Sequence, residues 1–162
     1  MIKALLQQIP RNRKIICLTG GAGEGKTLTM SVLGKKIRDQ FNAELYSNYS
    51  LSESKQVSKL SLNEKIKIVC IDEFERVYMN SKGTVHFLLN NEDNNIIFIL
   101  TAFDINRLDE KIKEMVDLCM IVKKNDQETI TVKSTNTNFT MELNVSDNKD
   151  QYNAFELPNI QF

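Results

Sequence analysis

Several features that mark membrane, secreted or zinc-binding proteins are missing from this sequence of 162 residues. No apolar run approaches the ~18–20 residues that span a bilayer, and no signal peptide is recognisable. The three cysteines, Cys17, Cys70 and Cys119, are odd in number and each lies in an apolar run, which predicts reduced core thiols of a cytosolic protein. The single histidine, His86, cannot complete a zinc site with them at these spacings.

Net charge is missing too, because 21 basic residues balance 21 acidic ones. No global electrostatic field therefore draws the protein to nucleic acid, and contact with DNA would need a local patch or a ring of several copies. Lysine pairs such as Lys123 and Lys124 can line a channel shared by such copies. With 41% hydrophobic and 26% charged residues, the chain has the composition of an ordinary soluble globule.

The most informative stretch is Gly20–Thr27, which matches the phosphate-binding pattern of Gly, four residues, Gly-Lys-Thr. A strand-forming run at 14–19 precedes it, and apolar residues at the spacing of a helix face follow it at 27–41. In this context, backbone N–H groups and the helix N-terminus bind phosphate. The residues expected to hold ATP are Gly20, Gly21, Ala22, Gly23, Glu24, Gly25, Lys26, Thr27 and Leu28. Lys26 is expected to reach the β- and γ-phosphates and Thr27 to ligate Mg²⁺.

A second candidate site is the acidic pair Asp72 and Glu73, which ends the apolar run at 67–71. In open α/β sheets, ligands gather at this edge, so both carboxylates are expected to face the phosphate loop. Asp72 is suited to Mg²⁺, directly or through a water, and Glu73 can polarise the water that attacks the γ-phosphate. The alternative is an acidic strand end that only caps the next turn.

Thr101 ends the next apolar run, at 96–101. A polar side chain at that strand end can sense the γ-phosphate and orient the attacking water, which would make Thr101 a catalytic residue. An ordinary threonine at the end of a strand explains the same pattern nearly as well.

The order of elements predicts an α/β fold, namely the three-layer sandwich of a P-loop NTPase with a mainly parallel central sheet. Strands that are apolar on both faces alternate with helices, as in a parallel sheet covered on both sides. Strands are expected at 14–19, 44–47, 67–71, 96–101 and 118–122, and helices at 1–10, 27–41, 81–91 and 109–116. Period-two patterns around 134–138 predict a C-terminal antiparallel β-hairpin. We expect a single P-loop ATPase domain at 1–162, with a core at about 14–123 and a hairpin and tail at 128–162.

Five segments together resemble the HerA/FtsK group of P-loop motors: Gly20–Thr27, Tyr46–Leu51, Ile71–Glu75, Ile99–Ala102 and Leu108–Lys113. Their order is most similar to viral genome-packaging ATPases and to zonula occludens toxin-like phage ATPases. The Ser-Asn-Tyr-x-Leu segment within Tyr46–Leu51 is the most specific, because generic P-loop proteins lack it. The resemblance implies a ring that couples ATP hydrolysis to movement of double-stranded DNA. The phage-toxin branch usually carries a membrane anchor after this domain. This sequence shows no such segment, so the packaging branch is the expected one.

The sequence also departs from the family it resembles. Phe103 stands where members commonly have a glutamine, and Lys82, Lys111 and Lys113 stand where they tend to have arginine. Phosphoryl transfer gains ~10³–10⁵ in rate from an arginine delivered to the γ-phosphate, often by a neighbouring subunit. We expect Arg107 to have this role in trans, with Lys111 and Lys113 as alternatives. The hairpin and tail aromatics are expected to offer the neighbour an apolar surface, and these are Phe139, Tyr152, Phe155 and Phe162.

The resulting hypothesis is an ATP-hydrolysing motor that uses Mg²⁺, forms a homo-oligomeric ring and packages viral double-stranded DNA. It would act in the host cytoplasm or with the virion, without membrane contact, and be recruited by a capsid or portal-vertex protein. One alternative is a small P-loop kinase of a nucleotide or metabolite, although only five arginines are present to clamp two phosphate groups. A Glu placed to activate water would also be counterproductive in a kinase. The other alternative is a phage-assembly ATPase that does not move DNA.

Overall fold

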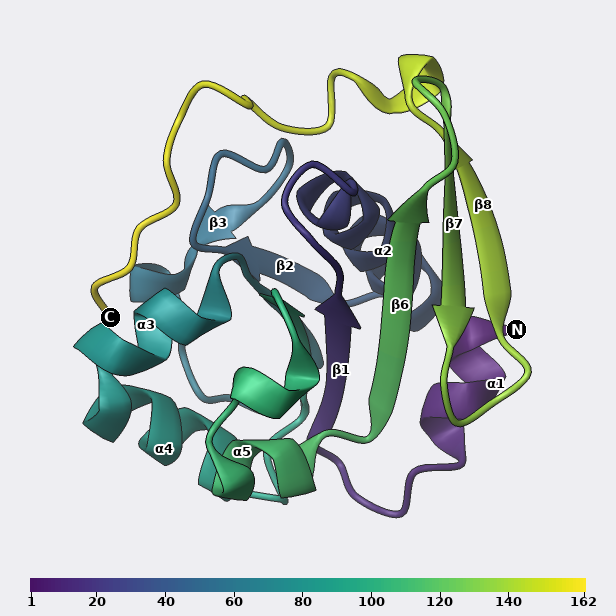
Figure 1. The fold of residues 1–162 in the computed structure, drawn as a ribbon. Coiled ribbons are helices and arrows are strands. Elements are labelled where there is room, and N and C mark those ends of the chain that lie inside the picture. Colours follow the sequence, from purple (N-terminus) through teal and green to yellow (C-terminus); the bar gives the residue numbers. More distant parts are fainter.

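All 162 residues are described by a computed structural model, which is built on one eight-stranded sheet in the order β3-β2-β4-β5-β1-β6-β7-β8 (Figure 1). The first six positions in this order run parallel, and β7 and β8 pair antiparallel at one edge. The strands are β1 (Lys14–Thr19), β2 (Glu44–Ser47), β3 (Lys55–Gln56), β4 (Lys67–Ile71), β5 (Ile96–Ala102), β6 (Leu118–Lys124), β7 (Thr129–Ser134) and β8 (Thr140–Asn144). The predicted α/β fold, with its mainly parallel sheet and C-terminal hairpin, is confirmed.

Helices cover both faces of the sheet. Helices α1 (Ile2–Gln7) and α2 (Lys26–Phe41) share one buried apolar cluster with the sheet, and α3 (Phe74–Asn80), α4 (Lys82–Asn90) and α5 (Glu110–Met115) share the other. Alternate residues of β1 enter the two clusters, because side chains of a strand point to opposite faces in turn. The sheet is therefore the middle layer of a three-layer sandwich.

Three elements differ from the sequence-based expectations. Helix α3 is absent from those expectations, and it follows directly after the acidic pair and buries Phe74 and Val77. The polar stretch at 52–65, which has no clear period, forms the two-residue strand β3 and the 3₁₀ turn Val57–Lys59. Strand β6 continues to Lys124, beyond the predicted end, because pairing with β7 extends to that residue.

The C-terminal region packs on its own chain more than the sequence indicated. Phe139 is buried against the core, and the Tyr152 ring packs edge-on against the Tyr49 ring at a centroid distance of 6.0 Å. Phe162 is half-buried beside α4, whereas Phe155 is 99% exposed. Of the aromatics expected to offer an apolar surface to a neighbour, Phe139 is therefore used inside the chain, Tyr152 and Phe162 are half-buried within it, and only Phe155 is fully exposed.

Residues 152–162, here called the C-terminal strap, cross the edge of the sheet where the parallel strands end (Figure 1). The strap starts near the hairpin, makes an isolated bridge between Tyr152 and Leu51, and ends at α4, where the Phe162 N–H donates to Ser81 Oγ at 3.0 Å. It thus connects the two sides of the molecule across the region where the phosphate loop lies.

All three cysteines are free thiols. Cys17 and Cys70 are fully buried, and burial raises the pKa of both thiols well above the usual range. Cys119, in β6, is only half-buried. None of the helices is both long enough and apolar enough to cross a membrane.

Candidate functional site

The phosphate loop connects β1 to α2, as the motif predicts. Gly23 and Gly25 have positive φ angles of 78° and 93°, which side chains rarely allow. A Cβ atom at Gly25 would also collide with Ile130 of the hairpin. The Lys26 ammonium donates to the carbonyl oxygens of Gly20 and Gly21, so it lies within the loop. The loop therefore has the backbone conformation and the cation that bind a polyphosphate.

The Asp72 carboxylate lies where three elements meet. Its Oδ2 accepts a hydrogen bond from Thr27 Oγ1 at the start of α2, at 3.0 Å, and its Oδ1 accepts one from Thr101 Oγ1, at 2.6 Å. The sheet order explains this meeting, because β5 lies between β1 and β4 and brings Thr101 between the phosphate loop and Asp72. The two strand ends therefore converge on the phosphate loop, as their positions in the sequence predict.

Thr101 is buried, and its hydroxyl also accepts the Glu73 N–H at 2.9 Å. One hydroxyl thus connects the carboxylate of Asp72 to the backbone of Glu73. This arrangement favours a positioning role for Thr101 over the direct contact with the γ-phosphate that its place in the sequence suggested.

Glu73 has a backbone conformation that is costly for a residue with a side chain. Its φ is 51° and its ψ 53°, in the left-handed region, immediately before α3. Such conformations cost of order 1–3 kcal/mol and gather at functional sites. The side chain is 40% exposed and its Oε2 lies 3.3 Å from Arg76, an exposed pair of little energetic weight. The Glu73 carboxylate is therefore accessible from the cavity that its residue lines.

A cavity of about 710 Å³ lies over the phosphate loop, within the range of small-molecule sites. One wall holds residues predicted from the motifs, including Lys26, Thr27, Leu28, Asp72 and Glu73. A second wall comes from the hairpin and the strap and was missed: Ile130, Val145, Tyr152, Ala154, Glu156, Leu157 and Pro158. The sequence did not indicate this wall, because its contacts join segments that are far apart in the chain.

Phe103 lies between two cations beside this cavity. Lys26 Nζ is 5.5 Å from the centre of its ring and the Arg107 Cζ is 4.7 Å from it, both within cation–π range. The Phe103 N–H donates to the Glu75 carboxylate at 3.1 Å and 3.2 Å. Phe103 lines the cavity and Arg107 does not. Arg107 is connected to the cavity only by its contact with the Phe103 ring.

Neither Lys111 nor Lys113, the lysines considered as alternative sources of charge, lines the cavity. The Lys113 ammonium donates to Asn106 Oδ1 at 3.0 Å, on the surface of the α5 region. Lys124, which was expected in a DNA channel, lines the cavity, and its N–H donates to Glu24 Oε2 at 2.6 Å. Lys124 is therefore placed at the cavity over the phosphate loop.

The residues present fit Mg²⁺ together with a nucleoside triphosphate. The Thr27 hydroxyl and the Asp72 carboxylate are hard oxygen donors, already within hydrogen-bonding distance of each other. No cluster of three or more His, Cys, Asp or Glu side chains is present. Mg²⁺ is usually held by one or two protein oxygens together with substrate phosphates and water, and the Thr27 hydroxyl and the Asp72 carboxylate can supply those protein oxygens.

A model of the ATPase family associated with various cellular activities (AAA) matches residues 16–136. The chain belongs to the AAA family of ATPases. The matched range contains the phosphate loop, the acidic pair and Thr101, so this AAA domain binds and hydrolyses ATP. No curated protein sequence matches the chain.

Solved structures share the fold at low sequence identity. The N-terminal domain of zonular occludens toxin from Neisseria meningitidis has a TM-score of 0.59 and 16% identity over 87% of this chain and 99% of that domain. The genome-packaging NTPase B204 from Sulfolobus turreted icosahedral virus 2, in complex with ATP-gammaS, has a TM-score of 0.51 and 13% identity over 80% and 96%. The DNA-packaging ATPase B204 from Sulfolobus turreted icosahedral virus gives 0.50 and 11% over 80% and 96%. These likenesses establish the fold of the AAA domain.

Proposed function

We propose that this AAA ATPase is a HerA/FtsK-type motor that moves double-stranded DNA, and that the process it drives is the packaging of a viral genome. The observation that carries the proposal is the fold shared with a viral genome-packaging NTPase over 80% of this chain and 96% of that one. The toxin domain that gives the higher TM-score, 0.59, belongs to the other branch that the sequence resembles. The motor would act in the host cytoplasm or with the virion, recruited by a capsid or portal-vertex protein.

Each residue of the site has a role in hydrolysis under this proposal. Lys26 binds the β- and γ-phosphates, and Thr27 and Asp72 hold Mg²⁺, which offsets phosphate charge when bound. Glu73 accepts a proton from the attacking water, and its accessible carboxylate can approach that water. Thr101 fixes the Asp72 carboxylate and the Glu73 backbone relative to each other through its two hydrogen bonds.

Delivery of Arg107 in cis is an alternative to the delivery in trans that the sequence favours. The sequence favours delivery to a neighbouring subunit, but the Arg107 guanidinium packs on the Phe103 ring of its own chain, which also lies within cation–π range of Lys26. This contact favours delivery of the positive charge in cis. Mixing an Arg107→Ala subunit with a Lys26→Ala subunit distinguishes the two. Delivery in trans restores turnover at sites that pair an intact loop with an intact neighbouring Arg107, whereas delivery in cis leaves the mixture inactive while both variants still assemble.

The proposal is tested by ATP turnover with and without double-stranded DNA, alongside displacement of a triplex-forming strand from that DNA. A motor should be stimulated by DNA of any sequence, displace the third strand only with ATP, and bind more weakly as salt rises, because backbone contacts release counterions. ATP turnover that ignores DNA would support an assembly ATPase instead. Transfer of the γ-phosphate to a metabolite rather than to water would support a kinase.

A further inference from the structure

A buried asparagine outside the predicted site holds the strand end that carries the acidic pair. Asn48 directly follows β2 and is 6% exposed. The ladder between β2 and β4 ends where Ser47 faces Cys70. The backbone of Asp72 therefore lies beyond regular strand pairing on this side.

The Asn48 side chain takes the place of the missing strand neighbour. Its Oδ1 accepts the Asp72 N–H at 2.7 Å, and its Nδ2 donates to the Asp72 carbonyl oxygen at 3.1 Å. A carboxamide carries a donor and an acceptor in the same arrangement as a peptide group, so it can continue the ladder by one residue. Asp has no donor for this purpose and Ala has neither group, so the position needs an amide of this length.

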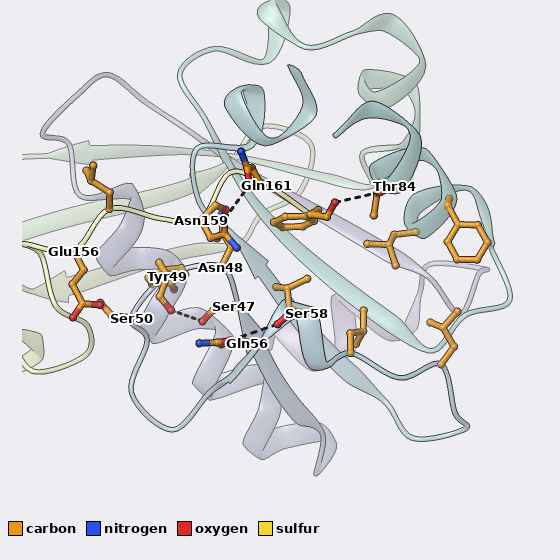
Figure 2. A pocket seen from close by; sticks show the side chains of 17 residues that line it. Ser47, Asn48, Tyr49, Ser50, Gln56, Ser58, Thr84, Glu156, Asn159 and Gln161 are labelled. Atoms are coloured by element: carbon orange, nitrogen blue, oxygen red, sulfur yellow. Dashed lines mark hydrogen bonds between the residues drawn. The ribbon is translucent and has the colours of Figure 1, made fainter. Parts of the chain in front are cut away.

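The same amide connects the acidic strand end to the strap. Nδ2 also donates to the Asn159 carbonyl oxygen at 2.9 Å, and the Asn159 N–H donates back to the Asn48 carbonyl oxygen at 2.6 Å. Figure 2 shows the two asparagines together in the wall of a second cavity, of about 550 Å³. Glu156 and Leu157 of the strap line both cavities, so the strap separates this cavity from the one over the phosphate loop.

We infer that Asn48 is a positioning residue of the ATPase site. By binding both backbone groups of Asp72, it fixes the direction in which the Asp72 and Glu73 side chains leave β4. The inference rests on the proposed roles of that pair, but its structural part stands without them. Groups that orient metal ligands from behind typically change metal affinity or activity by ~10–100-fold when removed.

The test compares Asn48→Ala and Asn48→Asp with wild type, and uses Asn159→Ala as the matched control. The control keeps both backbone contacts to Asn48 and loses only the Asn159 side chain, which accepts the Gln161 N–H. Three quantities are measured on folded protein: the affinity for ATPγS without metal, the Mg²⁺ concentration that half-saturates the tightening of ATPγS binding, and the amide exchange rates of Asp72, Glu73 and Lys26.

Both Asn48 variants should need ~10–100-fold more Mg²⁺ while the metal-free affinity stays within about twofold of wild type. In Asn48→Ala, amide exchange should accelerate at Asp72, whose N–H loses its acceptor, but not at Lys26, and the control should match wild type throughout. In Asn48→Asp, a side-chain oxygen can still accept the Asp72 N–H, so this variant reports on the lost donor alone. A variant that only unfolds at a lower temperature, with unchanged Mg²⁺ dependence and unchanged exchange at Asp72, overturns the inference. If the wild-type protein does not hydrolyse ATP, the proposed function is wrong. The amide exchange rates and the Mg²⁺ dependence of ATPγS binding still show whether Asn48 positions Asp72.

Discussion

The two walls of the nucleotide cavity have different origins in the sequence. One wall is the phosphate loop with the ends of β4 and β5, in which residues close in sequence carry the chemistry. The other wall is the hairpin and the strap, which reach the same cavity from the far end of the chain. The first wall supplies the cation, the carboxylates and the hydroxyls, whereas the second supplies mainly apolar side chains. The comparison indicates that the residues suited to binding and hydrolysing ATP and the residues that enclose the cavity come from separate parts of the chain.

The largest effect on the first wall is expected from Lys26→Ala. Removal of the ammonium eliminates a charge-assisted contact to phosphate, so the affinity for a fluorescent ATP analogue should fall on the order of 100-fold. Lys36→Ala, an exposed lysine on the same helix, is the matched control and should bind like wild type. Equal affinity of the two variants would mean that the loop does not hold the triphosphate.

Deletion of residues 153–162 tests the part of the second wall that the strap supplies, and it also removes the contact of Asn159 with Asn48. This removes Ala154, Glu156, Leu157 and Pro158 from the cavity but keeps Tyr152 and every catalytic residue. Nucleotide should dissociate about tenfold faster, equivalent to about 1.4 kcal/mol of lost wall contacts. Stopped-flow displacement of a fluorescent ADP measures the rate. An unchanged rate would show that the strap does not enclose the nucleotide.

The core beneath the first wall should make stability fall at high pH. Burial raises the pKa of Cys17 and Cys70 above the ordinary 9.0, so the folded state keeps protons that the unfolded chain releases. The free energy of unfolding should therefore decrease above about pH 9, by about 1.4 kcal/mol per pH unit for each thiol. Between pH 8 and 10 the loss amounts to about 1.4 kcal/mol in all for each thiol, because the unfolded thiol is only partly ionised near pH 9. Urea unfolding of Cys17→Ala over this range should show a loss that is smaller by that amount. An identical loss in wild type and variant would contradict the assignment.

The smallest effect concerns the backbone strain at Glu73. Glycine adopts the left-handed conformation freely, so Glu73→Gly should raise the free energy of unfolding by about 1 kcal/mol while abolishing hydrolysis. The same change at Glu75, inside α3, should instead lower stability by about 1 kcal/mol or more, because glycine is unfavourable within a helix and the Phe103 N–H loses its acceptor. Thermal unfolding of the two variants compares them directly. A Glu73→Gly protein less stable than wild type would show that the backbone conformation of Glu73 does not cost stability.

The sequence predicts the first wall well because its patterns are local. The glycine spacing at 20–27 and the strand-end positions of Asp72 and Thr101 were enough to predict which residues meet at this edge. The roles of Asn48 and Phe103 were not predictable, because each depends on contacts between segments far apart in the chain. The strap was missed for the same reason. Tyr152 and Phe162, which the sequence suggested as surface aromatics, pack against distant parts of the chain and hold the strap in place.

The central claim is that Glu73 activates water at a site that otherwise binds ATP without its help. The most direct measurement is the Glu73→Gln protein, assayed for nucleotide affinity and for phosphate release in a single turnover, with the exposed Glu110→Gln as control. The amide cannot accept the proton, so phosphate release should slow by ~10²–10⁴-fold while affinity stays within about twofold. Phosphate release at the wild-type rate from the Glu73→Gln protein would contradict the account.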